Sequence, residues 1–352
     1  MITAPIYIVG MGAASAIGRT VWANAAAARA GLCGFREHPF MVDSVGEPMR
    51  VAAAPWLEVG LGGAARLQQL LFPVIDEALQ PLAAYLQRLR VSLMLALPPT
   101  RPGRPEGLAA EVREAITRRY GTLFDPILPF ASGHAGGILA LREAAQLLVS
   151  KQPGCCVVAG IDSYMEPETL EWVEACDQLH GAGPENNAWG FVPGEAAAAL
   201  LLGNQPLASR MADVFAVMVG VGVAQETRLI KTDAVCIGEG LTKAFREALA
   251  AISPQDLVHN IFCDQNGEKY RADEYGFATL RTKERFRSIG DFHAPADCWG
   301  DIGAAGALVH LTLAAICQRK GYGKGPLSLI SASSEGGERG AAVIRGLDAR
   351  AA

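Results

Sequence analysis

The sequence predicts an α/β protein of two similar halves, and two observations carry this prediction. Short apolar runs without polar alternation, as in residues 155–159 and 196–202, are typical of strands covered on both faces. They alternate along the chain with helical patterns, which favours layers of helices and mostly parallel strands. Each half also holds one helix rich in small apolar residues, near residues 134–150 and 303–318. A helix that is apolar on nearly all sides is buried, so we expect both helices inside the molecule.

Length and composition narrow the choice of architecture. The chain has 352 residues, more than one ordinary hydrophobic core takes up. We therefore predict an N-terminal half at 1–203 and a C-terminal half at 204–352. Hydrophobic residues make up 50% of the chain and charged residues 19%, which excludes a disordered protein. The net charge of −5 leaves no basic footprint for binding nucleic acid.

The sequence gives no sign of a membrane or secretory destination. No apolar run reaches the roughly 18 residues that cross a bilayer, and the first residues lack the basic segment of a signal peptide. The 8 cysteines are scattered without a C-x-x-C pair, which is typical of buried thiols in a reducing compartment. We expect a cytoplasmic protein with no membrane span.

The chain starts with a pattern that resembles a nucleotide-binding turn. A strand at residues 6–9 leads into Gly10-Met11-Gly12, and we predict a tight turn there and a helix over residues 15–30. The third glycine of the G-x-G-x-x-G fingerprint would fall at Ser15, and no acidic residue ends a second strand about 20 residues later. We therefore predict no dinucleotide site and no cofactor.

The rest of the N-terminal half follows the same alternation. We predict that Ser132 is the N-cap of the buried helix, because serine is favoured there. A turn-rich insertion at residues 165–187 precedes the last strand of this half. Other predicted elements are an amphipathic helix (70–89), a buried strand (91–97), a charged helix (108–120) and one helical piece of the insertion (167–179).

The C-terminal half repeats the pattern of apolar strands and one buried small-residue helix. A turn at Asp264-Gln265-Asn266-Gly267 follows its second strand. The predicted elements are strands at residues 214–223, 256–263, 327–331 and 341–344, an amphipathic helix at 241–252, and the buried helix that ends near residue 318.

Six pieces of this chain, in this order, resemble the β-ketoacyl synthases, the condensing enzymes of fatty-acid and polyketide assembly. They are VGMGAASAIG with AAARAGLCGF, ILALREAAQLL with CCVVAG, GFVPGEAAAALLL, AVMVGVGVAQET, GDIGAAGALVHL and SASSEGGERGAAVI. The resemblance extends over essentially the whole chain. It implies a thiolase-like five-layer αβαβα sandwich of two duplicated halves, and a homodimer or a heterodimer with another ketosynthase-like chain.

The resemblance also implies three working residues, and all three are replaced here. The family has a cysteine at the start of the buried helix, and that position falls at His134. Other registers move it to Ala135 or Phe130, neither of which is a cysteine. The two family histidines fall at Asn266 and Gly300. We therefore take Ser132, His134, Asn266 and Gly300 as the candidate catalytic positions.

The C-terminal loop of the family carries a gating phenylalanine before a Gly-Gly pair. In this chain Glu335 takes that place before Gly336 and Gly337. We predict that these residues and Phe130 line the substrate site. A carboxylate at the Glu335 position would face the acyl channel, where an unpaired charge is costly to bury.

Two further positions have structural interpretations. Gly194 and Glu195 lie in the motif GFVPGE, and the resemblance implies that Glu195 bridges backbone groups between the halves. Cys263 and Cys298 flank the lost histidines, with Asp264 and Asp301 beside them, but their spacing has no zinc-finger pattern. We predict no metal site.

Our first hypothesis is a ketosynthase-like protein that is inactive in condensation. It would be a partner subunit or scaffold, binding an acyl chain, an acyl carrier protein or another protein; chain-length factors are the family precedent. The alternative is an acyltransferase or hydrolase that uses Ser132 and His134. Residues so close in one turn rarely face each other, and G-x-S-x-G is absent. The simpler interpretation is that Ser132 caps the helix and His134 fills the pocket, and the sequence leaves both roles open.

Overall fold

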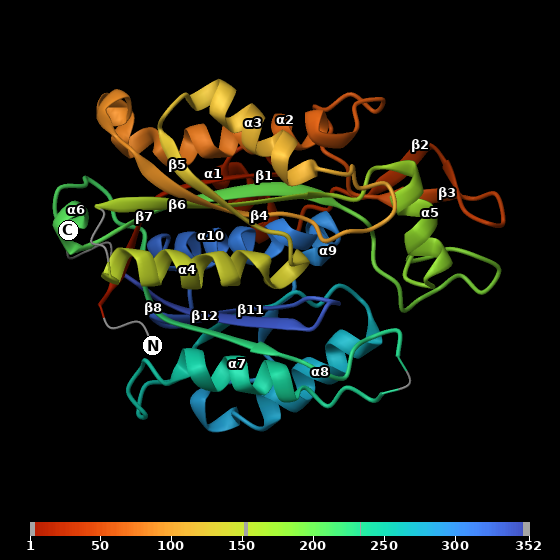
Figure 1. The fold of residues 1–352 in the computed structure, drawn as a ribbon. Coiled ribbons are helices and arrows are strands. Elements are labelled where there is room, and N and C mark those ends of the chain that lie inside the picture. The colour runs from red at the N-terminus through yellow and green to blue at the C-terminus, as the bar shows by residue number, and fades with distance from the viewer. Residues whose placement is uncertain (1–3, 151–153, 233, 348–352) are drawn as a thin grey trace.

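The computed structural model describes residues 4–150, 154–232 and 234–347. In this part of the chain, helices and strands form the five layers that the sequence predicts (Figure 1). Helices α4 and α10 lie in the middle, with strands on either side and a pair of helices outside each group of strands. The bounds of these helices are α2 (Gly63–Leu79) and α3 (Leu108–Tyr120) outside one half, α4 (Gly136–Ser150) and α10 (Gly306–Arg319) in the middle, and α7 (Glu239–Leu249) and α8 (Lys269–Leu280) outside the other.

The strands of the two halves have the same spatial order. The N-terminal half has the order β1 (Ile6–Ser15), β7 (Glu195–Gly203), β6 (Cys155–Ser163), β4 (Val91–Ala96), β5 (Phe124–Phe130). The C-terminal half has the order β8 (Ala216–Gln225), β12 (Glu338–Gly346), β11 (Leu327–Ser333), β9 (Asn260–Phe262), β10 (Phe292–His293). The start of β1 pairs with β8, so one hydrogen-bonded sheet runs through both halves. The matching orders show the duplication, and the division at 203/204 remains a prediction.

The prediction of mostly parallel strands is wrong. Strands β4, β5 and β6 pair in parallel, as do β9, β10 and β11. The pairings in the middle of the sheet, from β6 through β7, β1, β8 and β12 to β11, are antiparallel. An apolar run reports burial on both faces. It does not report the direction of the neighbouring strand, so the pattern could not separate the two cases.

The first glycines belong to a strand and not to the predicted turn. Strand β1 continues through Gly10 and Gly12 to Ser15, and α1 covers only Val21–Arg29. A Cβ atom on Gly10 would lie 2.1 Å from the carbonyl oxygen of Ala78 in α2. A Cβ on Gly12 would lie equally close, at 2.1 Å, to the carbonyl oxygen of Val74. These glycines allow α2 to lie directly on β1, which a G-x-G pattern alone does not distinguish from a turn.

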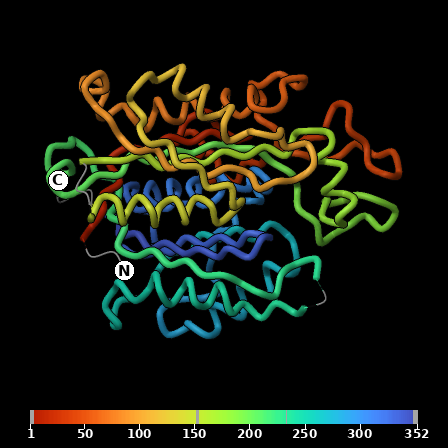
Figure 2. Tube along the Cα trace, in the orientation of Figure 1, coloured from red at the N-terminus to blue at the C-terminus, as the bar shows by residue number. Residues whose placement is uncertain are grey.

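Several smaller elements differ from the predictions or were not predicted. The helix predicted over residues 70–89 is α2 followed by a 3₁₀ helix, Gln80–Arg88. A hairpin of β2 (Arg36–Val42) and β3 (Pro48–Val51) projects from one end of the molecule beside the insertion that carries α5 (Pro167–Ala175), as Figure 2 shows. The short helices α6 (Gln205–Ala208) and α9 (Ala296–Trp299) complete the α-helices of the described residues.

The apolar core follows the layers. One cluster surrounds α4 and α10 between the two groups of strands. Others lie between the N-terminal strands and α2 and α3, and between the C-terminal strands and α7 and α8. Among the described residues we find no helix of the length and apolar character needed to cross a membrane.

Candidate functional site

The central helix begins at a turn that is closed by a residue of the other half. Strand β5 ends at Phe130, and a 3₁₀ turn, Gly133–Ala135, leads into α4. The Ser132 side chain makes no cap hydrogen bond, and its φ and ψ of −112° and 15° lie outside the extended region of an N-cap. Ser334 Oγ instead accepts a hydrogen bond of 2.8 Å from the Ala135 N–H and donates to the Ser132 carbonyl. The N-cap predicted at Ser132 is therefore wrong.

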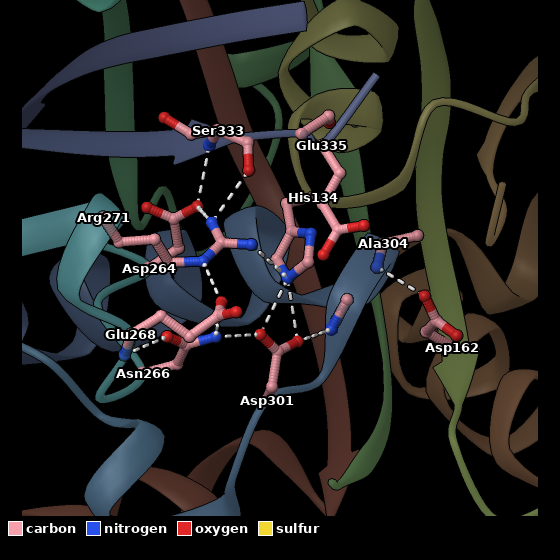
Figure 3. Close-up of polar contacts among 12 residues, drawn as sticks. His134, Asp162, Asp264, Asn266, Glu268, Arg271, Asp301, Ala304, Ser333 and Glu335 are labelled. Carbon is pink, nitrogen blue, oxygen red and sulfur yellow. Dashed lines mark hydrogen bonds and ion pairs between the residues drawn. The ribbon is translucent and has the colours of Figure 1, made fainter. Parts of the chain in front are cut away.

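His134 is buried at this entrance and is paired with Asp301 (Figure 3). The ring nitrogen Nε2 lies 2.8 Å from Asp301 Oδ1 and 2.9 Å from Oδ2. Only 8% of His134 and 4% of Asp301 is exposed. The carboxylate also accepts hydrogen bonds from the Gly303 N–H, at 2.8 Å, and from Asn266 Nδ2, at 2.6 Å. Asn266, a predicted site residue, therefore contacts the partner of His134 and makes no hydrogen bond to the imidazole itself among the described residues.

A guanidinium lies beside the same ring nitrogen of His134. Arg271 Nη2 is 3.3 Å from His134 Nε2. The same arginine donates to Asp264 Oδ2 at 2.7 Å and to Glu268 Oε2 at 3.0 Å, so two carboxylates hold it in place. Arginine only donates hydrogen bonds. The imidazole nitrogen therefore lies between a donor and the Asp301 acceptor.

The charges around this pair shift both pKa values. Burial opposes a charged imidazole, but the Asp301 carboxylate outweighs burial and the nearby Arg271, so the pKa of His134 is raised. Burial also opposes a charged carboxylate, but His134 and then Arg271 outweigh it, so the pKa of Asp301 is lowered well below its ordinary range. Both shifts favour the charged pair. An imidazole that keeps its proton to higher pH is a weaker general base.

Glu335 is held by two partners and is not an unpaired charge in a channel. Gln178 Nε2 donates to Glu335 Oε1 and to Glu268 Oε1, both at 2.7 Å. Lys231 Nζ lies 3.0 Å from Glu335 Oε2. Burial opposes ionisation of Glu335, but Gln178 and Lys231 outweigh it and its pKa is lowered. The insertion, the loop after β8 and the C-terminal loop therefore meet at this carboxylate.

The cavity at this site is small, and several charged and polar side chains line it. It measures about 110 Å³, and predicted site residues that line it are Ser132, His134, Glu335 and Gly336. No hydrogen bond joins Ser132 to His134 among the described residues. The other residues that line it are Pro99, Arg101, Ala131, Gly133, Asp162, Tyr164, Trp172, Gln178, Phe191, Ser334 and Glu338.

Other predicted site residues do not line this cavity. Phe130 packs against the central apolar cluster, and Gly337 and Gly300 do not line the cavity. Gly300 has a φ of 71°, and a Cβ atom there would lie 2.3 Å from the carbonyl oxygen of Val192. The backbone at Gly300 has no room for a side chain. No side chain can therefore stand at the position where the family has its second histidine.

Gly194 connects the two halves, and Glu195 does not make the contacts that we predicted. The Gly194 N–H donates to the Asp301 carbonyl at 2.8 Å. Glu195 instead pairs with Arg66 at 2.6 Å and 2.7 Å and accepts from the Ala54 N–H at 2.6 Å. The partners of Glu195 lie within the N-terminal half. The backbone contact between the halves is therefore made by Gly194 and not by Glu195.

Sequence reasoning missed the residues that determine the chemistry of this site. Arg271 and Glu268 come from α8 and the residue before it, and we did not predict α8. Asp301 was considered only as a metal ligand beside Cys298. Its signal was its place directly after Gly300, at the start of a family motif. That it pairs with His134, 167 positions away, follows only from the fold.

The chain has a thiolase-like fold of the kind found in ketosynthases, with a buried ionic cluster at the entrance of its central helix. A solved type II polyketide ketosynthase, in complex with its acyl-carrier protein and bound to the hexaketide, superposes with a TM-score of 0.80 and 15% identity over 98% of this chain and 100% of that chain. The ishigamide ketosynthase/chain length factor has a TM-score of 0.77 and 15% identity, over 98% and 99%. The ketosynthase from module 6 of the bacillaene synthase of Bacillus subtilis 168 has a TM-score of 0.77 and 15% identity, over 98% and 72%.

The sequence comparison covers a smaller part of this chain than the structural comparisons do. Polyketide synthase PksL of Bacillus subtilis (strain 168) is 28% identical over 106 residues, which is 29% of this chain and 2% of that protein. No protein-family model matches the chain. The solved structures confirm the predicted resemblance at the level of the fold, which the sequence indicated through the order of its matching motifs.

Proposed function

We propose that this chain is a ketosynthase-like protein that does not catalyse condensation and acts as a partner subunit or scaffold. The observation that carries this proposal is the cluster of His134, Asp301 and Arg271 at the entrance of α4. The resemblance to β-ketoacyl synthases puts the acyl-accepting thiol at that position.

The chemistry of the cluster supports an inactive site. Thioester formation needs a nucleophile that attacks a carbonyl, and losing it removes the covalent route altogether. None of the described residues lining the cavity is a cysteine. An imidazole paired to a carboxylate and next to a guanidinium is not a substitute thiolate. At the two histidine positions the chain has an amide, Asn266, and the bare backbone of Gly300.

The size of the cavity favours a partner or scaffold role over an acyl-binding role at this place. Pockets that hold small molecules measure on the order of 300–1,000 Å³, against about 110 Å³ here. Arg101, which lines the cavity, is bound to Asp162 at 2.6 Å, so part of the wall is itself a buried ion pair. An acyl chain would have to displace paired charges.

The structural neighbours suggest what the partner is, by analogy of fold alone. One is described as a ketosynthase in complex with an acyl-carrier protein, and another as a ketosynthase/chain length factor. We propose the corresponding role here: a dimer with another ketosynthase-like chain, the same or different, that engages a carrier protein.

The test is an assay of condensation with the purified full chain. The assay contains carrier protein loaded with a radiolabelled malonyl group and carrier protein loaded with an acyl group. An active ketosynthase is the positive control. We expect no labelled carbon dioxide above the protein-free rate and no acyl adduct by intact mass spectrometry. We also expect the chain to co-purify from its own cells with an active ketosynthase or a carrier protein. An acyl adduct on the wild-type chain would overturn the proposal.

A second candidate rests on a separate observation. Ser132 and His134 line one cavity, and Asp301 orients the imidazole through a contact to Nε2. Against this, the serine and the histidine are not hydrogen-bonded, and the pKa of His134 is raised. Hydrolysis or transfer of acyl-CoA that is lost in both Ser132→Ala and His134→Ala would support the enzyme. The absence of such activity, or activity that both variants retain, excludes it.

A further inference from the structure

A second buried polar cluster lies outside the candidate site and has no role in the proposed function. Glu226 follows β8, Cys236 lies in the loop before α7, and Glu274 lies on α8. One donor atom from each residue lies within 4.8 Å of the others. Glu226 is 2% exposed and Glu274 is 1% exposed, whereas the Cys236 residue is half-buried and can be reached from solvent. Three separate segments therefore bring two carboxylates and a thiol together.

One oxygen of this cluster lacks a partner. Glu274 Oε1 lies 2.6 Å from Arg339 Nε and 3.6 Å from Cys236 Sγ. Glu274 Oε2 is buried and makes no hydrogen bond among the described residues. Native proteins rarely leave a buried carboxylate oxygen in this state, and a bound ion is one of the few explanations. Glu226 is already held by the backbone N–H groups of Thr227 and Gly240, which fixes it in place.

The charges of the cluster do not balance without a cation. Glu226 and Glu274 contribute two negative charges, and the Arg339 guanidinium contributes one positive charge. With Cys236 protonated, the cluster has a net charge of about −1, and with a thiolate about −2. Buried unbalanced charge is expensive, and a divalent cation neutralises the charge of the thiolate form.

We propose that Glu226, Cys236 and Glu274 bind a zinc ion, with water as the fourth ligand. Zinc accepts thiolate and carboxylate ligands together, whereas magnesium and calcium take oxygen ligands. Tetrahedral zinc with ordinary bond lengths sets sulfur and oxygen ligands about 3.6 Å apart. The distance from Cys236 Sγ to Glu274 Oε1, the oxygen that Arg339 also contacts, is 3.6 Å, and the unpartnered Oε2 belongs to the same carboxylate. This site does not depend on the proposed function, and it differs from the Cys263 and Cys298 pair weighed from the sequence.

Binding must release a proton. Without metal, the Cys236 thiol donates to Glu274 Oε1, and burial, Glu274 and Glu226 raise its pKa to about 11. When the ion binds, the S–H bond breaks, the Zn–S bond forms, and the proton goes to solvent. Near neutral pH we therefore expect about one proton released per ion bound, and tighter binding as the pH rises.

A zinc ion at this site would also stabilise the C-terminal glycine-rich loop, which borders the candidate cavity. The Glu226 N–H donates to the Gly337 carbonyl at 2.7 Å. Arg339, paired with Glu274, donates to the Ser334 carbonyl. A zinc ion here would tie α8 and the loop before α7 to the C-terminal glycine-rich loop.

The experiment uses the full chain, reduced and stripped of metal, and titrated with Co²⁺ as a coloured substitute for zinc. We expect visible d–d bands and a near-ultraviolet thiolate-to-cobalt band that saturate at one ion per chain and bleach when Zn²⁺ is added. Cys236→Ser should remove the thiolate band and the proton release. The control Cys176→Ser changes another half-buried cysteine outside the cluster and should leave both unchanged.

Two variants keep the test decisive. If Cys236→Ser does not fold by circular dichroism, the nearly isosteric Glu274→Gln takes its place. We expect it to bind zinc at least tenfold more weakly in competition with a coloured chelator. The proposal is overturned if the wild-type chain gives no saturable thiolate band. It is equally overturned if the folded variants bind zinc as tightly as the wild-type chain.

Discussion

His134 is a buried imidazole held between a carboxylate and a guanidinium. Asp301 lies 2.8 Å away and Arg271 lies 3.3 Å away from the same ring nitrogen. The shorter contact and the raised pKa both favour the protonated ring. This side chain therefore contributes charge and packing to the entrance of α4, and that is why we assign it a structural role.

Removing the carboxylate should be costly because it leaves the buried imidazolium of His134 without its main partner and next to Arg271. For Asp301→Asn we expect a loss of about 3–5 kcal/mol in the free energy of unfolding, measured by urea denaturation. The control is Asp256→Asn, whose partner Arg345 is 39% exposed, and where we expect less than about 1 kcal/mol. Equal losses in the two variants would contradict this assignment.

The effect should depend on pH in a defined direction. The folded pKa of His134 is raised, so its contribution is complete below its unfolded pKa of about 6.5 and is lost as the pH rises through the folded value. The folded pKa of Asp301 is lowered, so its contribution is complete above about pH 4 and is lost as the pH falls through the folded value. The difference between wild type and Asp301→Asn should be largest between about pH 4 and 6.5. A difference that grows above this window would argue against the pairing.

At the scale of elements, the same close contact of helix and strand occurs in both halves. In β1, Gly10 and Gly12 face backbone carbonyls of α2, and in β8 a Cβ on Gly222 would lie 2.2 Å from the carbonyl oxygen of Ala244 in α7. Each strand starts its half of the sheet, and each helix covers that strand from outside. The duplicated fold thus repeats a contact that only glycine permits.

A side chain at such a contact should force the layers apart. For Gly12→Ala we expect a loss of about 1–3 kcal/mol or more in the free energy of unfolding, because the new methyl would meet the Val74 carbonyl. In the control, Gly276→Ala, the new methyl meets nothing within 4 Å on the surface of α8. We expect that variant to be neutral or more stable by up to about 1 kcal/mol. A Gly12→Ala protein as stable as wild type in urea would show that α2 shifts easily.

At the scale of the molecule, contacts from several elements join the halves around the site. Strand β1 pairs with β8, Gly194 bonds the Asp301 backbone, and Ser334 closes the turn before α4. The candidate cavity lies between these contacts and is lined by both halves. Its shape therefore depends on the relative position of the halves.

The cap across the halves can be tested with a matched pair of serines. Ser334→Ala removes the acceptor for the Ala135 N–H, and we expect a loss of about 1–2 kcal/mol in the free energy of unfolding. Ser132→Ala removes no cap hydrogen bond, so we expect a change within about 0.5 kcal/mol. The reverse order of the two losses would restore Ser132 as the cap.

The sequence by itself determined the layers. The apolar runs that became β6 and β7 and the small-residue helices that became α4 and α10 were predicted, because burial of a whole element leaves a local pattern. The order of the motifs was enough to predict the thiolase-like fold that the solved structures confirm.

Only the tertiary structure decided the directions of the central strands, the cap at Ser334 and the cluster around His134. The residues of that cluster are 137 and 167 positions from His134 along the chain. Local periodicity reports how much of a residue is buried. It cannot report which distant side chain shares that burial, because this depends on how the two halves of the sheet pair.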